Sequence, residues 1–139
     1  MSQQIIAISW SHLQTPIELR DKLSLSRKEI QNYLHLALDG SHILELAALS
    51  TCNRIEFYAL AESSDHVLST IKHFYANILK RNITLHRTSP DIYIGMEMIC
   101  HLSRVAAGMA SMLIGERQIL SQVKIAQQTL KESHPGADV

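Results

Sequence analysis

The chain has 139 residues, of which 46% are hydrophobic and 19% charged, the size and composition of one globular domain. Thirteen Lys and Arg balance thirteen Asp and Glu, so the formal net charge is zero, which argues against a surface for non-specific capture of nucleic acid or anionic membrane. The five glycines form neither G-x-G-x-x-G nor G-x-x-x-x-G-K, and the sequence therefore predicts no nucleotide cofactor site within this chain.

The cysteine content and the apolar runs predict where the protein resides. Cys52 and Cys100 cannot build a disulfide framework, which favours a reducing, cytoplasmic location. The first ten residues lack the features of a signal peptide. No apolar run approaches the ~20 residues needed to cross a bilayer, so we expect no membrane association.

Apolar periodicity and helix-start signals divide the chain into alternating strands and helices. Thr15-Pro16 is typical of a helix start, and Ser26 with Glu29 forms a capping-box signature. The predicted elements, in chain order, are a strand at 5–10, helices at 16–23 and 26–38, strands at 43–49 and 55–60, a helix at 63–80, a strand within 84–94 and helices at 96–107 and 111–131.

The order of these elements predicts the fold class. Setting aside the short helix at 16–23, the first six elements read β-α-β-β-α-β, the ferredoxin-like pattern in which an antiparallel sheet carries both long helices on one face. The two last helices are additions on the C-terminal side. We therefore expect a single α+β domain spanning residues 1–139.

Cys52 lies in the short connection between two predicted strands. Only residues 50–54 separate these strands, which favours a tight β-hairpin with the thiol at its tip. The adjacent Arg54 would favour the thiolate, and a thiolate can attack an acyl carbon to form a thioester. The alternative is that Cys52 is a small buried apolar residue.

A second group of reactive side chains lies on the predicted helix at 96–107. Glu97, His101 and Arg104 are spaced i, i+4 and i+7 and share one face. His101 can act as acid or base near neutral pH, and Arg104 can hold an anion. The alternative is a solvated face of salt bridges. Cys100 points away from this face and is expected in the core.

The remaining candidates are weaker. The glycine- and methionine-containing segment 108–120 is interpreted either as a loop packed between helices or as a loop that lines a substrate site. His66 and His73 lie two turns apart without a supporting carboxylate cluster, so the sequence predicts no metal site.

Four segments resemble one enzyme family. Residues 49–56, L-S-T-C-N-R-I-E, resemble the L-S-T-C-N-R-x-E signature of glutamyl-tRNA reductase, the first enzyme of the C5 route to tetrapyrroles and haem. Residues 101–108 are similar to the family's H-L-x-R-V-A-x-G, and residues 115–124 to its G-E-P-Q-I-L-G-Q-V-K. His12 and Pro16 match its H-K-T-A-P.

The resemblance implies a chemistry for the matching positions. Cys52 would attack the ester of glutamyl-tRNA and form a thioester, and hydride from NADPH would release glutamate-1-semialdehyde. Arg54 would bind the substrate carboxylate or stabilise the thiolate, and His101 would assist proton transfer or orient the α-amino acid portion of the substrate. The residues expected to line the glutamyl pocket are Thr51, Asn53, Arg54, Arg104, Ser111, Glu116 and Gln118.

The resemblance also implies what this chain lacks and what it meets. The NADPH-binding domain and the helical dimerisation domain of the family would follow this N-terminal catalytic domain, and neither is present in the chain. The implied partners are glutamyl-tRNA, the aminomutase that follows in the pathway, and haem or a regulator, with a homodimer as the full-length assembly.

Some positions depart from the family pattern. Leu13 and Gln14 replace its Lys-Thr, and Ala110 replaces an Asp that would pair with the substrate amino group. Arg117 and Ser121 replace a Pro and a Gly. Leu13, Gln14 and Ala110 favour an alternative function, a diverged binding or regulatory module of the same fold that binds haem, tRNA or a partner protein without turnover.

Overall fold

The computed structural model describes residues 3–84 and 88–111, with the backbone alone for 107–111. Its strands are β1 (Gln4–Ser11), β2 (Ile43–Ser50), β3 (Arg54–Ala61) and β4 (Asp91–Ile94). Its helices are α1 (Ile17–Leu23), α2 (Arg27–Tyr33), α3 (Ser64–His73) and α4 (Met96–Ser111). A 3₁₀ turn, η1 (Leu34–Leu38), follows α2, and a π-helical turn, η2 (Phe74–Ile78), follows α3.

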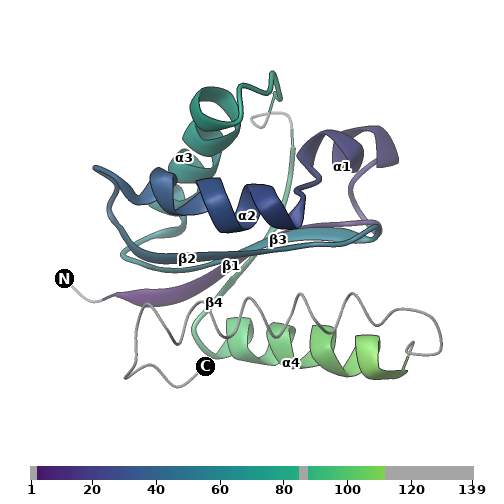
Figure 1. Cartoon of the computed structure of the whole chain (residues 1–139). Coiled ribbons are helices and arrows are strands. Elements are labelled where there is room, and N and C mark those ends of the chain that lie inside the picture. The colour runs from purple at the N-terminus through teal and green to yellow at the C-terminus, as the bar shows by residue number, and fades with distance from the viewer. Residues whose placement is uncertain (1–2, 85–87, 112–139) are drawn as a thin grey trace.

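The four strands form one sheet in the order β2-β3-β1-β4, and each neighbouring pair is antiparallel. Helices α1, α2 and α3 cover one face of this sheet and α4 covers the other (Figure 1). The predicted α+β class and antiparallel sheet are confirmed.

Both faces of the sheet carry apolar side chains because both are covered. Ile6, Ile8 and Trp10 of β1 pack toward α1–α3, in a core that also holds aromatic side chains of β3 and α3. On the opposite face, Ala7 packs in a smaller cluster with side chains of α4. Alternate residues of a strand point to opposite faces, so β1 contributes to both clusters.

Two predicted helices are continued by tighter or wider turns. The helix predicted at 26–38 begins with the expected capping box, but its last five residues form η1. A 3₁₀ turn aligns residues three apart, and in this way Leu34 and Ala37 are both buried. The helix predicted at 63–80 ends at His73, and the wide turn η2 that follows places Phe74 and Tyr75 in the core.

Helix α4 is longer than predicted and faces the sheet differently. It runs to Ser111, whereas the helix predicted at 111–131 lies, after its first residue, outside the described residues. Met98, Leu102 and Val105 face the sheet, which leaves Cys100 exposed. The expectation of a core Cys100 is therefore wrong. No helix in the described ranges is long and apolar enough to cross a membrane.

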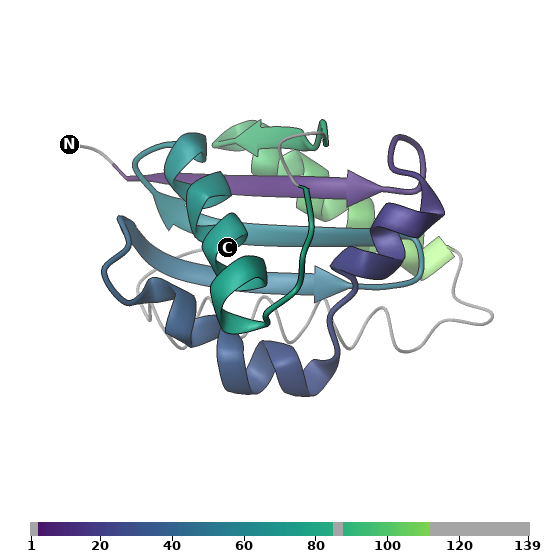
Figure 2. The same ribbon diagram turned by 90° about the horizontal axis from the view of Figure 1, so that it is seen from above.

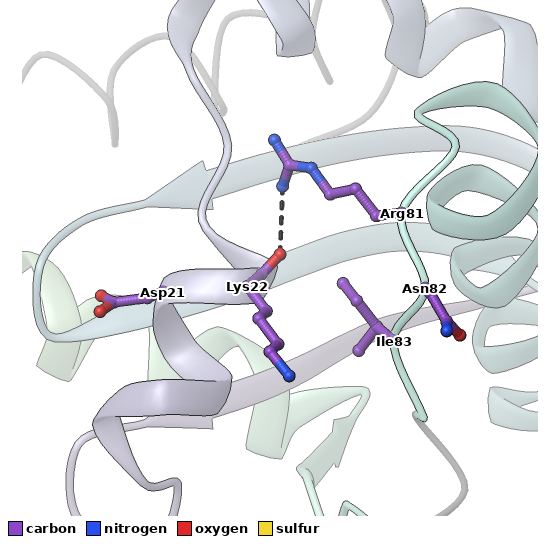
Figure 3. Close-up of a pocket in the computed structure, with 5 residues that line it drawn as sticks. All are labelled: Asp21, Lys22, Arg81, Asn82 and Ile83. Carbon is purple, nitrogen blue, oxygen red and sulfur yellow. Dashed lines mark hydrogen bonds between the residues drawn. The ribbon is translucent and has the colours of Figure 1, made fainter.

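Arg81, just after η2, ties the α3 end of the fold to α1 and α2. Its guanidinium donates to the main-chain carbonyls of Lys22 (3.2 Å) and Ser24 (2.5 Å) and forms an ion pair with Glu29 (2.7 Å). Figure 3 shows the bond to the Lys22 carbonyl. These carbonyls lie at the end of α1, where no helical donor remains for them.

We expect Arg81→Met to lower the free energy of unfolding by about 1–3 kcal/mol, because three acceptors lose a charged donor. Urea unfolding of the 139-residue chain measures this. Arg27→Met, which removes an exposed cation from the first turn of α2, is the matched control and should change stability little. Equal losses in both variants would contradict the assigned role of Arg81.

Candidate functional site

The β2–β3 hairpin is built by a threonine. Thr51 donates its main-chain N–H to the Arg54 carbonyl (2.9 Å), and its Oγ1 accepts from the main-chain N–H groups of Asn53 and Arg54, both at 3.2 Å. This hydroxyl-stabilised turn leaves Cys52 exposed at the tip. The predicted tight hairpin is confirmed, and the interpretation of Cys52 as a buried apolar residue is wrong.

The connection between β1 and α1 holds the tip from the side. The His12 main-chain N–H donates to the Asn53 carbonyl at 2.7 Å. Arg20 of α1 donates to the carbonyls of Cys52 (2.7 Å) and Thr15 (3.1 Å). The hairpin tip and α1 lie side by side at one end of the sheet (Figure 2). The backbone that carries the thiol is therefore fixed by two separate segments.

A buried carboxylate lies two residues into β3 from the tip. The side chain of Glu56 is 0% exposed and accepts hydrogen bonds from Ser9, Tyr58 and His101, the last at 2.6 Å. Arg54 forms a longer ion pair with the same carboxylate, at 3.4 Å. Both carboxylate oxygens have donors, which is what a buried charge requires.

The electrostatics of this cluster follow from its contacts. Burial raises the pKa of Glu56, but the hydrogen bond and positive charge of His101 and the hydrogen bonds from Ser9 and Tyr58 outweigh it, and the net pKa lies below the ordinary 4.5. Burial, then the Glu56 charge, hold the pKa of Tyr58 well above 10. Glu56 is thus an anion and Tyr58 a neutral donor at neutral pH.

His101 is fixed by two contacts. Its Nε2 bonds Glu56, and its ring stacks on that of Tyr93 from β4, with centroids 3.9 Å apart and planes 10° from parallel. The imidazole is buried between the sheet and α4. A histidine paired with a carboxylate in this way can donate or accept a proton while its ring orientation is retained.

The structure brings part of the predicted site together. Thr51, Cys52, Asn53 and Arg54 share the hairpin tip, and Arg54 meets His101 at Glu56. Among the described residues, no hydrogen bond or ion pair joins the Cys52 thiol to Arg54 or His101. The Cys52 thiol is exposed at the hairpin tip, whereas the Glu56 carboxylate and the His101 imidazole are buried.

The predicted face of α4 is divided. Glu97 and Arg104 are exposed, and neither side chain has an ion pair in the described part of the chain. His101 is buried, so the interpretation as a solvated salt-bridge face is wrong for this residue. Ser111 ends α4, and its side chain, like Ala110, Glu116 and Gln118, lies outside what the structure describes.

Sequence reasoning missed several residues of the candidate site. They are Ser9, Glu56, Tyr58 and Tyr93 in the buried cluster and Arg20 at the hairpin tip. One signal was present, since Glu56 ends the L-S-T-C-N-R-I-E motif, whereas its alternation with the apolar Ile55 and Phe57 predicts an exposed side chain. Its pairing with Ser9, its register partner on β1, depends on the sheet and is not visible along the chain.

Neither a metal centre nor the open pocket beside α1 offers a second reactive site in the described residues. No group of three or more His, Cys, Asp or Glu side chains within residues 3–84 and 88–111 has a metal-binding arrangement. An open pocket is lined by Asp21, Lys22, Arg81, Asn82 and Ile83 (Figure 3). The Arg81 guanidinium is already engaged there by protein acceptors, and no thiol or imidazole lines the pocket.

These features define a class of protein, an α+β domain that displays a thiol on a fixed hairpin beside a buried carboxylate–imidazole pair. The sequence matches the family "Glutamyl-tRNAGlu reductase, N-terminal domain" over residues 8–137. The chain belongs to this family.

Individual relatives agree with this assignment. Glutamyl-tRNA reductase of Prochlorococcus marinus (strain MIT 9515) is 38% identical over 121 residues, which are 87% of this chain and 28% of the relative. The enzyme of Picosynechococcus sp. (strain ATCC 27264 / PCC 7002 / PR-6) is 34% identical over 132 residues, 95% of this chain and 31% of the relative. The chain thus spans less than a third of the curated relatives' length.

A solved structure shares the fold. Glutamyl-tRNA reductase from Methanopyrus kandleri aligns with a TM-score of 0.64 and 23% identity, over 96% of this chain and 29% of that chain. At this identity the similarity concerns the fold alone.

The depressed pKa of Glu56 predicts a pH-dependent stability. Its ionised form is stabilised by folding, so this contribution is present above pH 4.5 and is lost as the pH falls through the folded-state pKa. We expect Glu56→Gln to cost about 1–3 kcal/mol at pH 7, because His101 loses a charged acceptor. The cost should shrink on acidification below pH 4.5.

Urea unfolding across this pH range measures the difference. Glu97→Gln, which changes an exposed carboxylate on α4, is the matched control and should give a small difference at every pH. A cost for Glu56→Gln that stays constant down to strongly acidic pH would show that its charge does not stabilise the fold.

Proposed function

We propose that this chain is the acyl-accepting catalytic domain of a glutamyl-tRNA reductase. The observation that carries the proposal is the exposed Cys52 thiol, fixed at a hairpin tip within the family match. The strand order β2-β3-β1-β4 supports interpreting the fold as ferredoxin-like, with α4 added on the second face.

The half-reaction is an acyl transfer. Cys52, after losing its proton to solvent, attacks the carbonyl carbon of the ester that joins glutamate to the terminal ribose of tRNA. A carbon–sulfur bond forms, the ester carbon–oxygen bond breaks, and the ribose oxygen leaves as a hydroxyl after gaining a proton. The product on the protein is a glutamyl thioester.

Arg54 and His101 suit two groups in this reaction, the glutamyl carboxylate and the leaving ribose oxygen. Arg54 is only partly neutralised by Glu56 at 3.4 Å, so its guanidinium retains donors for the glutamyl carboxylate. His101 supplies the proton to the leaving oxygen, and Glu56 holds its ring for that transfer. Thr51, Asn53, Arg104, Ser111, Glu116 and Gln118 complete the proposed substrate pocket.

The second half-reaction belongs to the wider protein. Hydride from NADPH would reduce the thioester to glutamate-1-semialdehyde and return the Cys52 thiolate. The sequence holds no G-x-G-x-x-G motif for this cofactor. In this chain alone, water would slowly hydrolyse the thioester. We further propose a cytoplasmic, homodimeric full-length enzyme that passes its product to an aminomutase and responds to haem or a regulator.

A binding module without turnover is the second candidate. Its support is the departure of Leu13, Gln14 and Ala110 from the family pattern. Such a module would bind glutamyl-tRNA, haem or a partner protein and leave Cys52 unmodified.

We expect glutamyl-tRNA to leave a hydroxylamine-sensitive glutamyl adduct on Cys52, detectable by intact-protein and peptide mass spectrometry. Cys52→Ser should remove the thioester adduct. Cys100→Ser is the matched control, because Cys100 is also exposed but lies on α4 away from the hairpin. The adduct should persist in this control.

The same experiment separates the two candidate functions. Binding of glutamyl-tRNA without any adduct on Cys52 would favour the module. An adduct that Cys100→Ser removes and Cys52→Ser retains would contradict the assignment of the nucleophile.

A further inference from the structure

Two exposed apolar side chains lie on segments next to the hairpin tip, one on the turn between β1 and α1 and one at the start of α1. Leu13 is 79% exposed and Ile17 is 58% exposed. Single exposed apolar residues are common on protein surfaces and by themselves indicate nothing. Leu13 and Ile17 differ from such residues because the segments that carry them are hydrogen-bonded to the hairpin of Cys52.

The turn is held in place by main-chain hydrogen bonds. The Ser11 carbonyl accepts from the N–H groups of Gln14 (3.1 Å) and Thr15 (2.8 Å), which closes the turn around Leu13. The preceding His12 bonds Asn53 at 2.7 Å, next to Cys52. Leu13 is therefore displayed by a turn attached to the hairpin tip.

Ile17 is attached to the tip through its own helix. It is the first residue of α1, and Arg20, one turn later, donates to the Cys52 carbonyl at 2.7 Å. The segments that carry these two side chains and the thiol are thus hydrogen-bonded to one another, and α1 and the β2–β3 hairpin tip lie at the same end of the sheet (Figure 2). We call Leu13 and Ile17 the apolar rim of the site.

The chemistry of the substrate determines what reaches this rim. In an aminoacyl-tRNA, the ester carbon that Cys52 attacks is separated from the terminal adenine by a single ribose. When the ester lies at the thiol, the base must therefore lie close beside it. A base can bury its flat face against apolar side chains while polar neighbours bind its edges, and His12 and Gln14 are both exposed here.

We propose that the apolar rim binds the terminal adenosine of the aminoacyl-tRNA and so orients the ester toward Cys52. This inference rests on the proposed function, because it takes glutamyl-tRNA as the substrate. The rim selects for the nucleoside part of the substrate, whereas the hairpin and the Glu56 cluster act on the glutamyl part.

Acylation of Cys52 by two esters tests the proposal. One probe is glutamyl-tRNA, and the other is the p-nitrophenyl ester of glutamate, which has no nucleoside. We expect the double variant Leu13→Ser/Ile17→Ser to raise the half-saturating concentration of glutamyl-tRNA in single-turnover acylation about tenfold, because two aliphatic side chains no longer bury against the base. Its acylation by the p-nitrophenyl ester should equal that of the unaltered chain.

Leu44→Ser is the matched control, because Leu44 on β2 is 55% exposed and lies outside the turn. It should leave both reactions unchanged. The inference is overturned if the double variant reacts normally with glutamyl-tRNA, or if it slows equally with both esters. If Cys52 is acylated by both esters and the double variant has no effect, the role of the apolar rim is contradicted and the proposed function is retained.

A binding measurement does not depend on acylation. Uncharged tRNA ending in CCA is compared with the same tRNA lacking its terminal adenosine, by fluorescence titration against the 139-residue chain. The proposal expects tighter binding of the complete tRNA, and loss of this preference in the double variant. Equal affinities for the two tRNAs in the unaltered chain would overturn it, even where Cys52 forms no adduct and the proposed function fails.

Discussion

The ionised carboxylate of Glu56 is the constraint on which the arrangement of this domain depends. A fully buried charge is tolerated only when donors satisfy it, and here the donors come from three elements. Ser9 is on β1, directly opposite Glu56 in the register, Tyr58 lies two residues further along β3, and His101 is on α4. Removing any one of these donors would leave fewer hydrogen bonds to offset the cost of burying the Glu56 charge.

This requirement explains why α4 covers the second face of the sheet at a defined rotation. Apolar packing of Met98, Leu102 and Val105 would by itself tolerate small shifts of the helix. A hydrogen bond of 2.6 Å from His101 to Glu56 does not, because its strength falls steeply with distance and angle. The stacking of Tyr93 on the imidazole restrains the ring from the β4 side.

The sequence was informative where the structure depends on neighbours along the chain. The hairpin at Cys52 could be predicted because a short connection with Thr51 forms its own turn. The capping box at Ser26 is local in the same way. The two non-α turns could not be predicted, because they form so that Leu34, Ala37, Phe74 and Tyr75 reach a core built by distant strands.

The candidate site was predictable to a similar extent. The hairpin residues around Cys52 follow from spacing and resemblance, whereas the burial of His101 and the exposure of Cys100 depend on which side of α4 meets the sheet. Periodicity gives the separation of residues around a helix but not the direction in which the sheet lies. The packing of Met98, Leu102 and Val105 and the hydrogen bond between His101 and Glu56 set that direction, and Glu56 is 45 residues away from His101 in the chain.

The division between an exposed thiol and a buried carboxylate–imidazole pair suits the proposed acyl transfer. In that proposal the nucleophile attacks an ester on a large RNA, and it therefore has to lie on the surface, where water competes for every hydrogen bond. An imidazole that must hold its orientation is better placed in a dry layer, where its bond to a carboxylate is stronger.

Arg54 lies between the exposed thiol and the buried pair, since it follows the hairpin tip and also reaches Glu56. A substrate carboxylate that binds Arg54 would compete with Glu56 for the same guanidinium. Substrate binding would thereby weaken the Arg54–Glu56 contact, and the Glu56 charge would then rely more on its hydrogen bond with His101. The exposed hairpin tip and the buried pair are in this way coupled through the Arg54 side chain.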